Sequence, residues 1–521
     1  MTRLQSVRFD RCIAVWIPTV VVLIAAGRLS AQSVESPSRP NIVLIMCDDM
    51  GWSDIGCYGG EIDTPNLDRL AAEGLRFTQF YNNAKCTTTR ASVVTGLYPR
   101  RRGPLLKENM VTIGEVLRAA GYQTALSGKW HLGSQAPRRP IDRGFDEFYG
   151  LLDGCCNYFN PAQPDPPYKG GRVRVFAHND ERITDFPDDF YTTDAFTDHA
   201  IDNVRRFAAA EKPFFLHLCY TAPHYPLHAK PEDIAKYRGH YLIGWEELRR
   251  RRHQRQLEMG LVDDKWQLSA TDSRAYPWES ADHERDDLRM AAYAAMIDSM
   301  DQNIGRLLGA LRETGVERNT LIMFLSDNGG CAEEPEGRRN TDPAGPGEYY
   351  TAVGPSWGWA QNTPFRRYKV WMHEGGVATP LICRWPAAIE PGQITHQVGH
   401  IIDFLPTFAE LAGANYPDRV GERTILPVEG ISLAPILQGH ERAGHEKLFW
   451  EFTGNRAVRA GQWKLVWDKL VRRWELYDLA ADRTETTDLA EQHPRRVEDL
   501  SRAWYAWADR TGAPYPAVRD E

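Results

Sequence analysis

Apolar runs rich in β-branched residues recur along the chain and alternate with stretches of helical periodicity. The runs that predict buried strands are Asn41–Met46, Tyr122–Leu126, Phe214–Cys219 and Leu321–Leu325. The stretches that predict helices, each followed by a glycine or ending close to one, are Pro65–Glu73, Thr112–Ala120 and Leu288–Glu313. Strands that alternate with helices predict an α/β fold, with a large, mostly parallel sheet flanked by helices.

The pattern changes after about Gly430. Four short strand-like segments follow closely on one another, at Lys447–Phe452, Ala457–Arg459, Trp463–Trp467 and Trp474–Tyr477, and a final helix is predicted over Pro494–Asp509. We therefore expect a main domain over residues 32–430. A small C-terminal subdomain over residues 431–521 is expected to hold an antiparallel sheet and one helix.

The first residues have the features of a targeting segment. A basic start at residues 1–11 precedes an apolar run from Cys12 to Gly27, and small residues follow before Gln32. The run is short for a membrane span and contains a proline, so a cleaved signal peptide over residues 1–31 is favoured over a retained anchor. We expect an exported protein, periplasmic or extracellular, without stable membrane insertion after cleavage.

Composition narrows the range of partners. The chain has 521 residues and a formal net charge of -8, which does not favour nucleic acid as a partner. Of its nine cysteines, Cys12 leaves with the signal peptide and Cys86 lies in a motif described below. The remaining seven cannot all pair within one chain, so a disulfide framework is not expected. The neighbouring Cys155 and Cys156 could still belong to a bridge.

Acidic and amide side chains follow two of the predicted strands. Asp48 and Asp49 come after the first strand, and Asp327 and Asn328 follow the strand at Leu321–Leu325. Ligands of open α/β sheets bind at the carboxyl ends of the strands. An all-oxygen set of this kind suits calcium or magnesium rather than zinc. Ordinary turn chemistry of loop residues is the alternative interpretation.

Five motifs in order carry a family resemblance. Lys85–Gly96 (KCTTTRASVVTG) resembles the sulfatase signature, in which Cys-x-Pro-Ser-Arg is followed by a short helix and Thr-Gly. The other motifs are Gly128–Gly133 (GKWHLG), Ala222–Pro226 (APHYP), Ser326–Gly329 (SDNG), and Lys369 with Glu374–Gly376. The chain thus resembles the formylglycine-dependent, arylsulfatase-like sulfatases of the alkaline phosphatase superfamily, from Asn41 to the C-terminal sheet.

The resemblance implies hydrolysis of sulfate esters, either aryl sulfates or sulfated carbohydrates. It implies that a formylglycine-generating maturation enzyme oxidises Cys86, and that the hydrated aldehyde attacks sulfur. It also implies one Ca2+ ion per chain, held by Asp48, Asp49, Cys86, Asp327 and Asn328.

The same resemblance assigns roles to basic residues. Cations fixed in a water-poor site stabilise the negative charge of a sulfate ester, and Arg90, Lys129 and Lys369 can supply them. By resemblance, Arg90 orients the hydrated formylglycine, and His224, helped by Lys369, protonates the leaving oxygen. His131 then takes a proton from the remaining hydroxyl, which expels sulfate and restores the aldehyde.

The signature departs from the family pattern at Thr88 and Thr89, where the family usually has Pro or Ala and then Ser. The maturation enzyme reads these positions, so a Cys86 that is not converted is an alternative. An unconverted thiol could not release sulfate by the aldehyde route, and a threonine hydroxyl is an alternative nucleophile. Two other functions remain open: a phosphoester or phosphonate hydrolase of the same superfamily, and a non-catalytic binder of sulfated glycans.

Aromatic and histidine side chains near these motifs allow two interpretations. Trp357 and Trp359 could stack on a sugar or aryl group, or they could pack their loop onto the core. His228 and, more weakly, His373 could face the pocket.

Two charged groups are interpreted as structural. The basic run Arg249–Arg252 predicts a solvated helix face rather than a rim that attracts polyanionic glycans. Asp298 and Asp301, at helical spacing, predict surface or packing positions rather than a second metal site.

Overall fold

The computed structural model describes residues 39–100, 103–337 and 340–515. The predicted signal peptide, residues 1–31, lies outside the described residues. None of the helices in the described part of the chain is long and apolar enough to cross a bilayer.

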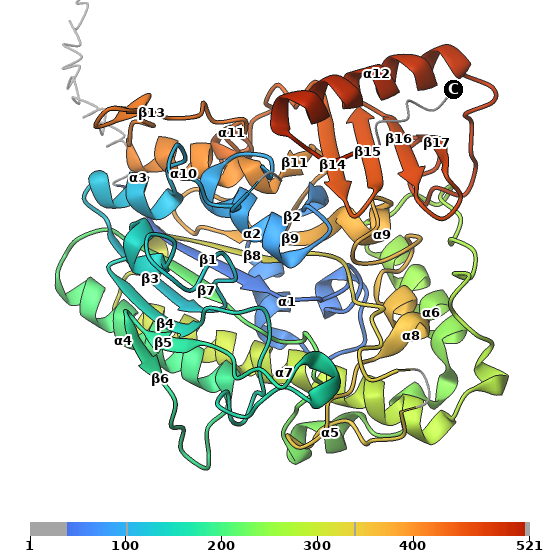
Figure 1. The fold of residues 1–521 in the computed structure, drawn as a ribbon, viewed down its shortest axis with the longest axis horizontal. Coiled ribbons are helices and arrows are strands. Elements are labelled where there is room, and N and C mark those ends of the chain that lie inside the picture. Colours follow the sequence, from blue (N-terminus) through green and yellow to red (C-terminus); the bar gives the residue numbers. More distant parts are fainter. Residues whose placement is uncertain (1–38, 101–102, 338–339, 516–521) are drawn as a thin grey trace, which may run out of the picture. The chain divides into compact units, whose positions relative to one another are not determined.

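An 11-stranded mixed sheet forms the centre of the described part (Figure 1). Its strands are β1 (Asn41–Cys47), β2 (Leu75–Tyr81), β3 (Gln123–Gly128), β4 (Glu147–Leu151), β5 (Phe176–His178), β6 (Glu181–Ile183), β7 (Phe214–Cys219), β8 (Thr320–Ser326), β9 (Ala378–Arg384), β10 (Gln393–Thr395) and β11 (Gly399–His400). They follow the order β10-β2-β9-β8-β1-β7-β3-β4-β5-β6, and β11 pairs with β2. The block from β8 to β4 is parallel, whereas β9, β5 and β6 join it antiparallel to their neighbours.

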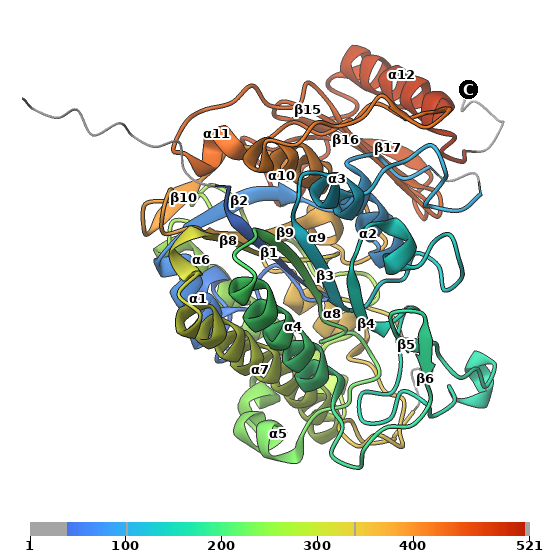
Figure 2. The same cartoon turned by 90° about the vertical axis from the view of Figure 1, so that its left-hand side faces the viewer.

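Helices cover both faces of this sheet (Figure 2). In chain order the helices are α1 (Pro65–Ala72), α2 (Cys86–Thr95), α3 (Ile113–Ala119), α4 (Thr192–Ala209), α5 (Pro231–Tyr237), α6 (Trp245–Glu258), α7 (His283–Glu313), α8 (Gly354–Gln361), α9 (Glu374–Val377), α10 (Phe404–Ala412), α11 (Ala434–Leu437) and α12 (Pro494–Thr511). Helices α4 and α7 lie together on one face, and α3 and α10 lie together on the other. The predicted α/β architecture is confirmed.

The central strands are continuous apolar runs because both of their faces are buried. All residues of β7 and β8 are buried, as are those of β1 after Asn41. Strands β1 and β8 are parallel neighbours whose last residues, Cys47 and Ser326, are aligned. The residues that follow these two strands therefore leave the sheet side by side, which sets the position of the site described below.

A separate four-stranded antiparallel sheet follows, as predicted (Figure 1). Its strands are β14 (Leu448–Phe452), β15 (Asn455–Ala460), β16 (Trp463–Asp468) and β17 (Arg473–Asp478), and α12 packs on it. A two-stranded ribbon, β12 (Arg419–Val420) and β13 (Arg423–Thr424), precedes it. A buried ion pair joins this sheet to α9, because Lys464 Nζ on β16 lies 2.8 Å from Glu374 Oε1.

The basic run on α6 is not the solvated helix face that the sequence predicted. Arg249 and Arg252 are completely buried, whereas Arg250 and Arg251 are exposed and pair with Glu247. Residues three apart lie on the same side of a helix, so the run divides between two faces. On the inner face, Arg252 pairs with Asp54 at 2.6 Å and Arg249 donates to the carbonyl of Trp359 at 2.8 Å.

Both tryptophans have packing roles. Trp357 packs against Trp245 with ring centroids 5.3 Å apart, and Trp359 lies under the Arg249 guanidinium, 4.1 Å from the ring centroid.

The two histidines that could face the pocket, His228 and His373, likewise have structural roles. His228 Nε2 donates to the Tyr349 carbonyl at 2.6 Å, and His373 Nε2 lies 3.1 Å from Glu475.

The remaining structural interpretations are also settled by contacts. Asp301 accepts the backbone N–H of Leu67 at 2.8 Å, so it caps α1. Asp298 accepts the Tyr237 hydroxyl at 2.9 Å. All eight cysteines in the described residues are free, so Cys155 and Cys156 form no bridge.

Candidate active site

The four oxygen-bearing residues predicted as metal ligands meet at the carboxyl ends of β1 and β8. Asp48, Asp49, Asp327 and Asn328 are all buried. Asn328 Nδ2 donates to Asp49 Oδ1 at 2.7 Å, and the backbone N–H of Asp49 donates to Asp327 Oδ1 at 3.4 Å. Asp49 has φ 68°, a left-handed conformation that turns the chain sharply and lets consecutive carboxylates reach one centre.

Two oxygen atoms of this cluster have no hydrogen-bond partner. They are Asp48 Oδ1 and Asn328 Oδ1, and both are buried. Burying an unpaired oxygen is costly, so native proteins rarely leave one without a partner. Carboxylate and amide oxygens are the ligands that hard cations prefer. The described residues therefore fit a calcium or magnesium ion.

Three buried cations surround the acidic cluster. Arg90 pairs with Asp327 at 2.8 Å, Lys369 pairs with Asp49 at 2.7 Å, and Lys129 pairs with Asp48. Burial and the neighbouring Asp327 nevertheless raise the pKa of Asp48 above its ordinary value. Burial is the larger of the two causes, and it disfavours the charged form of Asp48, which a further cation beside this carboxylate would stabilise.

Cys86 is the first residue of α2, and its side chain is buried. Its Sγ lies 3.5 Å from Nδ1 of His131. The free N–H groups at the start of a helix favour negative charge, so this position suits a nucleophile and an anionic substrate. The helix ends at Gly96, whose φ of 66° closes its last turn.

The threonines after Cys86 are occupied by local hydrogen bonds. Thr88 Oγ1 donates to the carbonyl of Lys85 at 2.8 Å, and Thr89 Oγ1 accepts the backbone N–H of Asn83 at 3.0 Å. Both side chains are completely buried. Both hydroxyls therefore stabilise the start of α2 through hydrogen bonds, and neither takes the alternative role of a hydroxyl nucleophile.

His131 comes from the loop after β3, in a left-handed conformation with φ 59°. Gly154 packs directly on its ring, since a Cβ there would lie 2.5 Å from the imidazole. Burial, together with Lys129 and Arg90, holds the pKa of His131 well below its usual range. The ring is therefore neutral near pH 7 and can accept a proton.

His224 faces the same centre from the loop after β7, with Nε2 3.5 Å from Asp49 Oδ2. Its Nδ1 donates to the Tyr225 carbonyl at 2.5 Å, because a carbonyl can only accept. Burial and Lys369 hold the pKa of His224 well below its usual range. The neutral ring thus has its lone pair on Nε2, and it becomes a proton donor there only after it is protonated.

A carboxylate that the motifs did not indicate lies close to these cations. Glu333 Oε1 is 3.2 Å from Lys85 Nζ and 4.0 Å from Lys369 Nζ, and Glu333 also accepts the Tyr225 hydroxyl. Its side chain is 37% exposed, so it is reachable from solvent next to buried catalytic candidates. The only signal in the sequence is its place in the loop that follows the SDNG motif.

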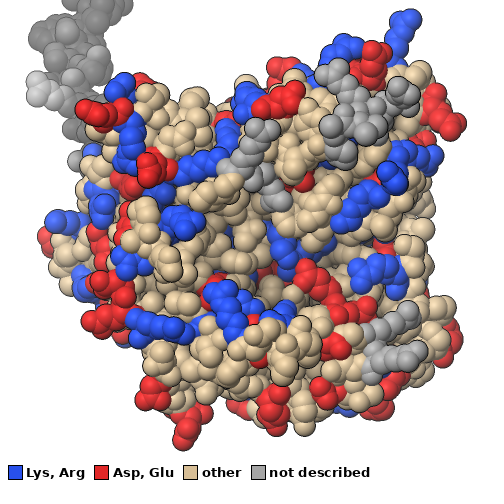
Figure 3. All heavy atoms as spheres, viewed as in Figure 1, with Lys and Arg blue, Asp and Glu red and all other residues tan. Residues whose placement is uncertain are grey.

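On the face shown in Figure 3, basic and acidic side chains are intermixed, and the surface is hollowed near the middle of the view. Lys and Arg side chains lie at the edge of this hollow.

Comparison with known proteins places this chain in a family. The Sulfatase family model matches residues 40–414, and the model of the N-sulphoglucosamine sulphohydrolase C-terminal region matches residues 365–502. The arylsulfatase of Klebsiella aerogenes is 31% identical over 465 residues, which cover 82% of this chain and 98% of that protein. N-acetylgalactosamine-6-sulfatase of Canis lupus familiaris is 28% identical, covering 89% of this chain and 78% of that protein.

Comparison with solved structures agrees with this family assignment. The crystal structure of Ps i-CgsB in complex with k-i-k-neocarrahexaose matches with a TM-score of 0.67 and 27% identity, over 90% of this chain and 93% of that one. The fold, the family models and these relatives lead to one conclusion: the chain belongs to the sulfatase family and is a sulfuric ester hydrolase with an alkaline-phosphatase-like fold.

Proposed function

We propose that the protein hydrolyses sulfate esters of carbohydrates, with formylglycine made from Cys86 as nucleophile and one bound Ca2+ ion. The observation that carries the proposal is the position of Cys86. Its thiol lies at the start of α2, 3.5 Å from His131, and α2 also supplies Arg90 to the acidic cluster. By its resemblance to the family signature, this thiol is the one that would be modified.

Asp48, Asp49, Asp327 and Asn328 would hold the calcium ion, with residue 86 as a further ligand. The unpartnered oxygens of Asp48 and Asn328 support this assignment. When bound, the ion would supply Lewis-acid polarisation and a fixed template for the anion.

The surrounding side chains would bind and orient the sulfate group. Lys129 and Lys369 are completely or almost completely buried ammonium groups, so their attraction for an anion is weakly screened. Arg90 is fixed by contacts that include Asp327 at 2.8 Å, the Lys129 carbonyl at 2.8 Å and Asp48 at 3.4 Å, and it would hold the side chain of residue 86 in position.

Two histidines would move protons. His131, neutral and beside residue 86, would accept a proton from the hydroxyl at that position. His224 Nε2 would carry a proton to the leaving oxygen, because an anionic substrate favours the protonated imidazole that Lys369 disfavours in the free enzyme.

Thr88 is compatible with the start of α2. It is the third residue of the helix, where the backbone N–H has no intrahelical acceptor. The proline of the family signature and the threonine of this chain can therefore adopt the same backbone here. This supports recognition of the segment by a formylglycine-generating maturation enzyme.

The substrate class and the location are inferred from the relatives and from the sequence. The relatives include the arylsulfatase of Klebsiella aerogenes as well as N-acetylgalactosamine-6-sulfatases, and a similar structure is in complex with k-i-k-neocarrahexaose. The two carbohydrate cases are the reason for proposing a sulfated carbohydrate as substrate. The predicted signal peptide favours export.

The test is a substrate comparison with protein produced together with a formylglycine-generating system. We expect turnover of 4-nitrophenyl sulfate and of sulfated oligosaccharides, with the higher kcat/KM for a carbohydrate and little turnover of 4-nitrophenyl phosphate. The variant C86A is expected to be inactive on all of them. A phosphate ester preferred over sulfate would overturn the proposal in favour of a phosphoester hydrolase. Tight binding of sulfated glycans without turnover would favour a non-catalytic binder.

A further inference from the structure

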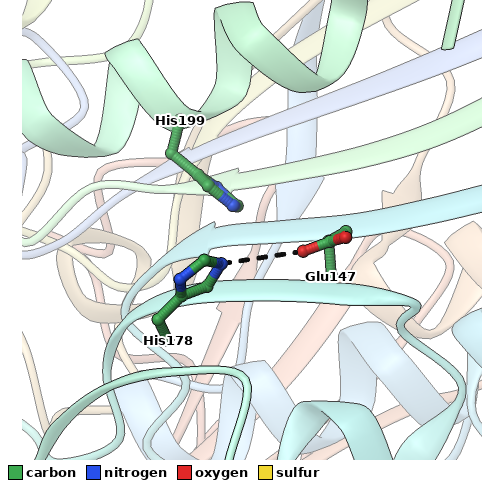
Figure 4. A group of neighbouring side chains, drawn as sticks. All are labelled: Glu147, His178 and His199. Atoms are coloured by element: carbon green, nitrogen blue, oxygen red, sulfur yellow. Dashed lines mark ion pairs between the residues drawn. The ribbon is translucent and has the colours of Figure 1, made fainter. Parts of the chain in front are cut away.

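Three potential metal ligands converge where β4, β5 and α4 meet (Figure 4). They are Glu147 on β4, His178 at the end of β5 and His199 on α4. One ligand atom from each lies within 4.8 Å of the others, and His178 Nε2 is 3.7 Å from Glu147 Oε2. We propose that these residues form a binding site for a divalent transition-metal ion such as zinc, separate from the catalytic centre.

The ligand types select the ion. Two imidazoles and one carboxylate are a donor set that suits zinc, whereas calcium prefers oxygen ligands alone. Ligands bound at about 2.1 Å from one ion can lie no more than about 4.2 Å apart. The observed separations therefore require only a small closing movement, and two of the three side chains are at least partly accessible for it, since His178 is 51% exposed and Glu147 is 21% exposed.

His199 is already oriented as a ligand. Its Nδ1 lies 2.7 Å from Ser127 Oγ, a buried hydroxyl on β3. If Nδ1–H donates to that hydroxyl, the lone pair of a neutral ring is on Nε2, the arrangement that outer partners give to metal-binding histidines. The Asn203 amide lies 3.2 Å from Nε2 and also donates to the His199 carbonyl at 2.8 Å. It can keep the bond to the carbonyl when a metal ion occupies Nε2.

The carboxylate has a competing partner that does not block the site. Arg206 donates to Glu147 Oε1 at 2.8 Å, whereas the oxygen that faces His178 is Oε2. Asn179 approaches Oε2 only at 3.4 Å. An ion on Oε2 can therefore coexist with the Arg206 pair, and that pair is half exposed and worth little energy.

A metal ion at this site would stabilise the strand pair β4–β5, which contacts residues of the catalytic centre. His178 pairs with Tyr149 in the β4–β5 ladder, and β4 ends at Leu151, whose carbonyl accepts the backbone N–H of Trp130 at 2.8 Å. The loop between the two strands contains Gly154, which packs on His131. A metal ion on the three ligands would join β4, β5 and α4, so its effect is expected on stability rather than on the chemical step.

The test is zinc binding to the full chain in calcium-containing buffer, measured by isothermal titration calorimetry. We expect one zinc ion per chain, with at least tenfold weaker binding in H178A and in H199A. The variant H240A, which removes an exposed histidine elsewhere, should bind zinc as the parent does. H224A should also retain zinc binding; it controls for the acidic cluster at the catalytic centre, which is one of two other groups of potential ligands in the described residues, the second being His373, Asp468 and Glu475.

A second measurement keeps the outcome independent of catalysis. At a hundredfold excess of zinc over its Kd, Tm should rise by about 3 °C in the parent protein and not in H178A. His178 is exposed, so H178A should fold and keep its calcium-dependent sulfatase activity. Unchanged zinc affinity in both H178A and H199A, or loss of zinc binding in H224A alone, would overturn the proposal.

Discussion

The Sγ of Cys86 and Nδ1 of His131 lie 3.5 Å apart, although the two residues belong to motifs 45 positions apart in the chain. Cys86 begins α2, and His131 follows β3 in a left-handed turn. The pair joins the proposed nucleophile position to a neutral imidazole beside three buried cations. The first prediction rests on this contact.

Replacing His131 by Asn should lower kcat by about 10²- to 10⁴-fold, because the side chain proposed to accept the proton beside residue 86 is lost. KM should change much less, since the cations proposed to bind sulfate remain. Steady-state kinetics with 4-nitrophenyl sulfate measures both, and the mass of the Cys86 peptide checks that maturation is unaffected. A kcat within twofold of the parent value would remove His131 from the proton path.

The Asn328→Ala variant should weaken calcium binding at least tenfold, because it removes an unpartnered buried oxygen without changing the charge of the cluster. Calorimetric titration of chelator-treated protein with Ca2+ gives the affinity. Asn160→Ala, at an exposed loop position, is the matched control and should bind calcium normally. Equal affinity in the two variants would argue against Asn328 as a ligand.

The Glu333→Gln variant should change selectivity between substrates of different charge. Burial opposes ionisation of Glu333, but Lys369 and Lys85 outweigh it and hold its pKa at about 2, so the carboxylate is charged near neutral pH. It should repel a second anionic group near the scissile sulfate. We expect kcat/KM for a disulfated sugar, relative to a monosulfated one, to rise about fivefold.

The neighbouring Glu334→Gln variant serves as the control for Glu333, because Glu334 lies 3.7 Å from Arg274 and no ion pair joins it to Lys85 or Lys369 in the described residues. If the ratio of kcat/KM for the disulfated and monosulfated sugars is the same in Glu333→Gln, Glu334→Gln and the parent, Glu333 does not affect selectivity for substrate charge.

Asp403→Asn should destabilise the protein by about 3 kcal/mol. The buried Asp403 carboxylate accepts His445 Nε2 at 2.7 Å and Arg442 at 2.8 Å, and Arg442 would be left nearly buried without a counter-charge. Chemical denaturation gives the free energy of unfolding, and the exposed Asp418→Asn is the control. A loss no larger than that of the control would mean that the ion pair contributes little.

The same carboxylate should make stability sensitive to acid. Burial raises the pKa of Asp403, but His445 and Arg442 outweigh burial and lower it below the ordinary value. A lowered folded-state pKa gives stability that is present above the unfolded pKa and is lost as pH falls through the folded one. Between about pH 5 and pH 3, the parent should lose more stability than Asp403→Asn. Parallel losses would contradict this assignment.

The sequence predicts the fold well where burial is continuous. Strands β7 and β8 were visible as apolar runs because both of their faces are covered, and the C-terminal sheet was visible as short segments with turns between them. The sequence also placed Asp48 and Asp327 at the ends of strands, and the structure brings them side by side because β1 and β8 are parallel neighbours.

Other features depend on contacts between distant segments. Arg249 and Arg252 look like solvated charges in sequence, but their partners in the interior are Asp54 and helix α8, which contains Trp359. Glu333 shows no motif of its own, because its role is defined by cations from residues 85 and 369. No local pattern records which distant partners reach such a side chain.

The most direct test of the account is the mass of the peptide that contains Cys86, from protein produced together with a formylglycine-generating system. Digestion after glutamate releases residues 74–108, whereas trypsin would cut at Lys85 and Arg90 and leave a very small fragment. The account predicts a peptide lighter by the change from CH2SH to CHO, in protein that hydrolyses sulfate esters. A peptide that retains unmodified cysteine in protein that is nevertheless fully active would contradict it.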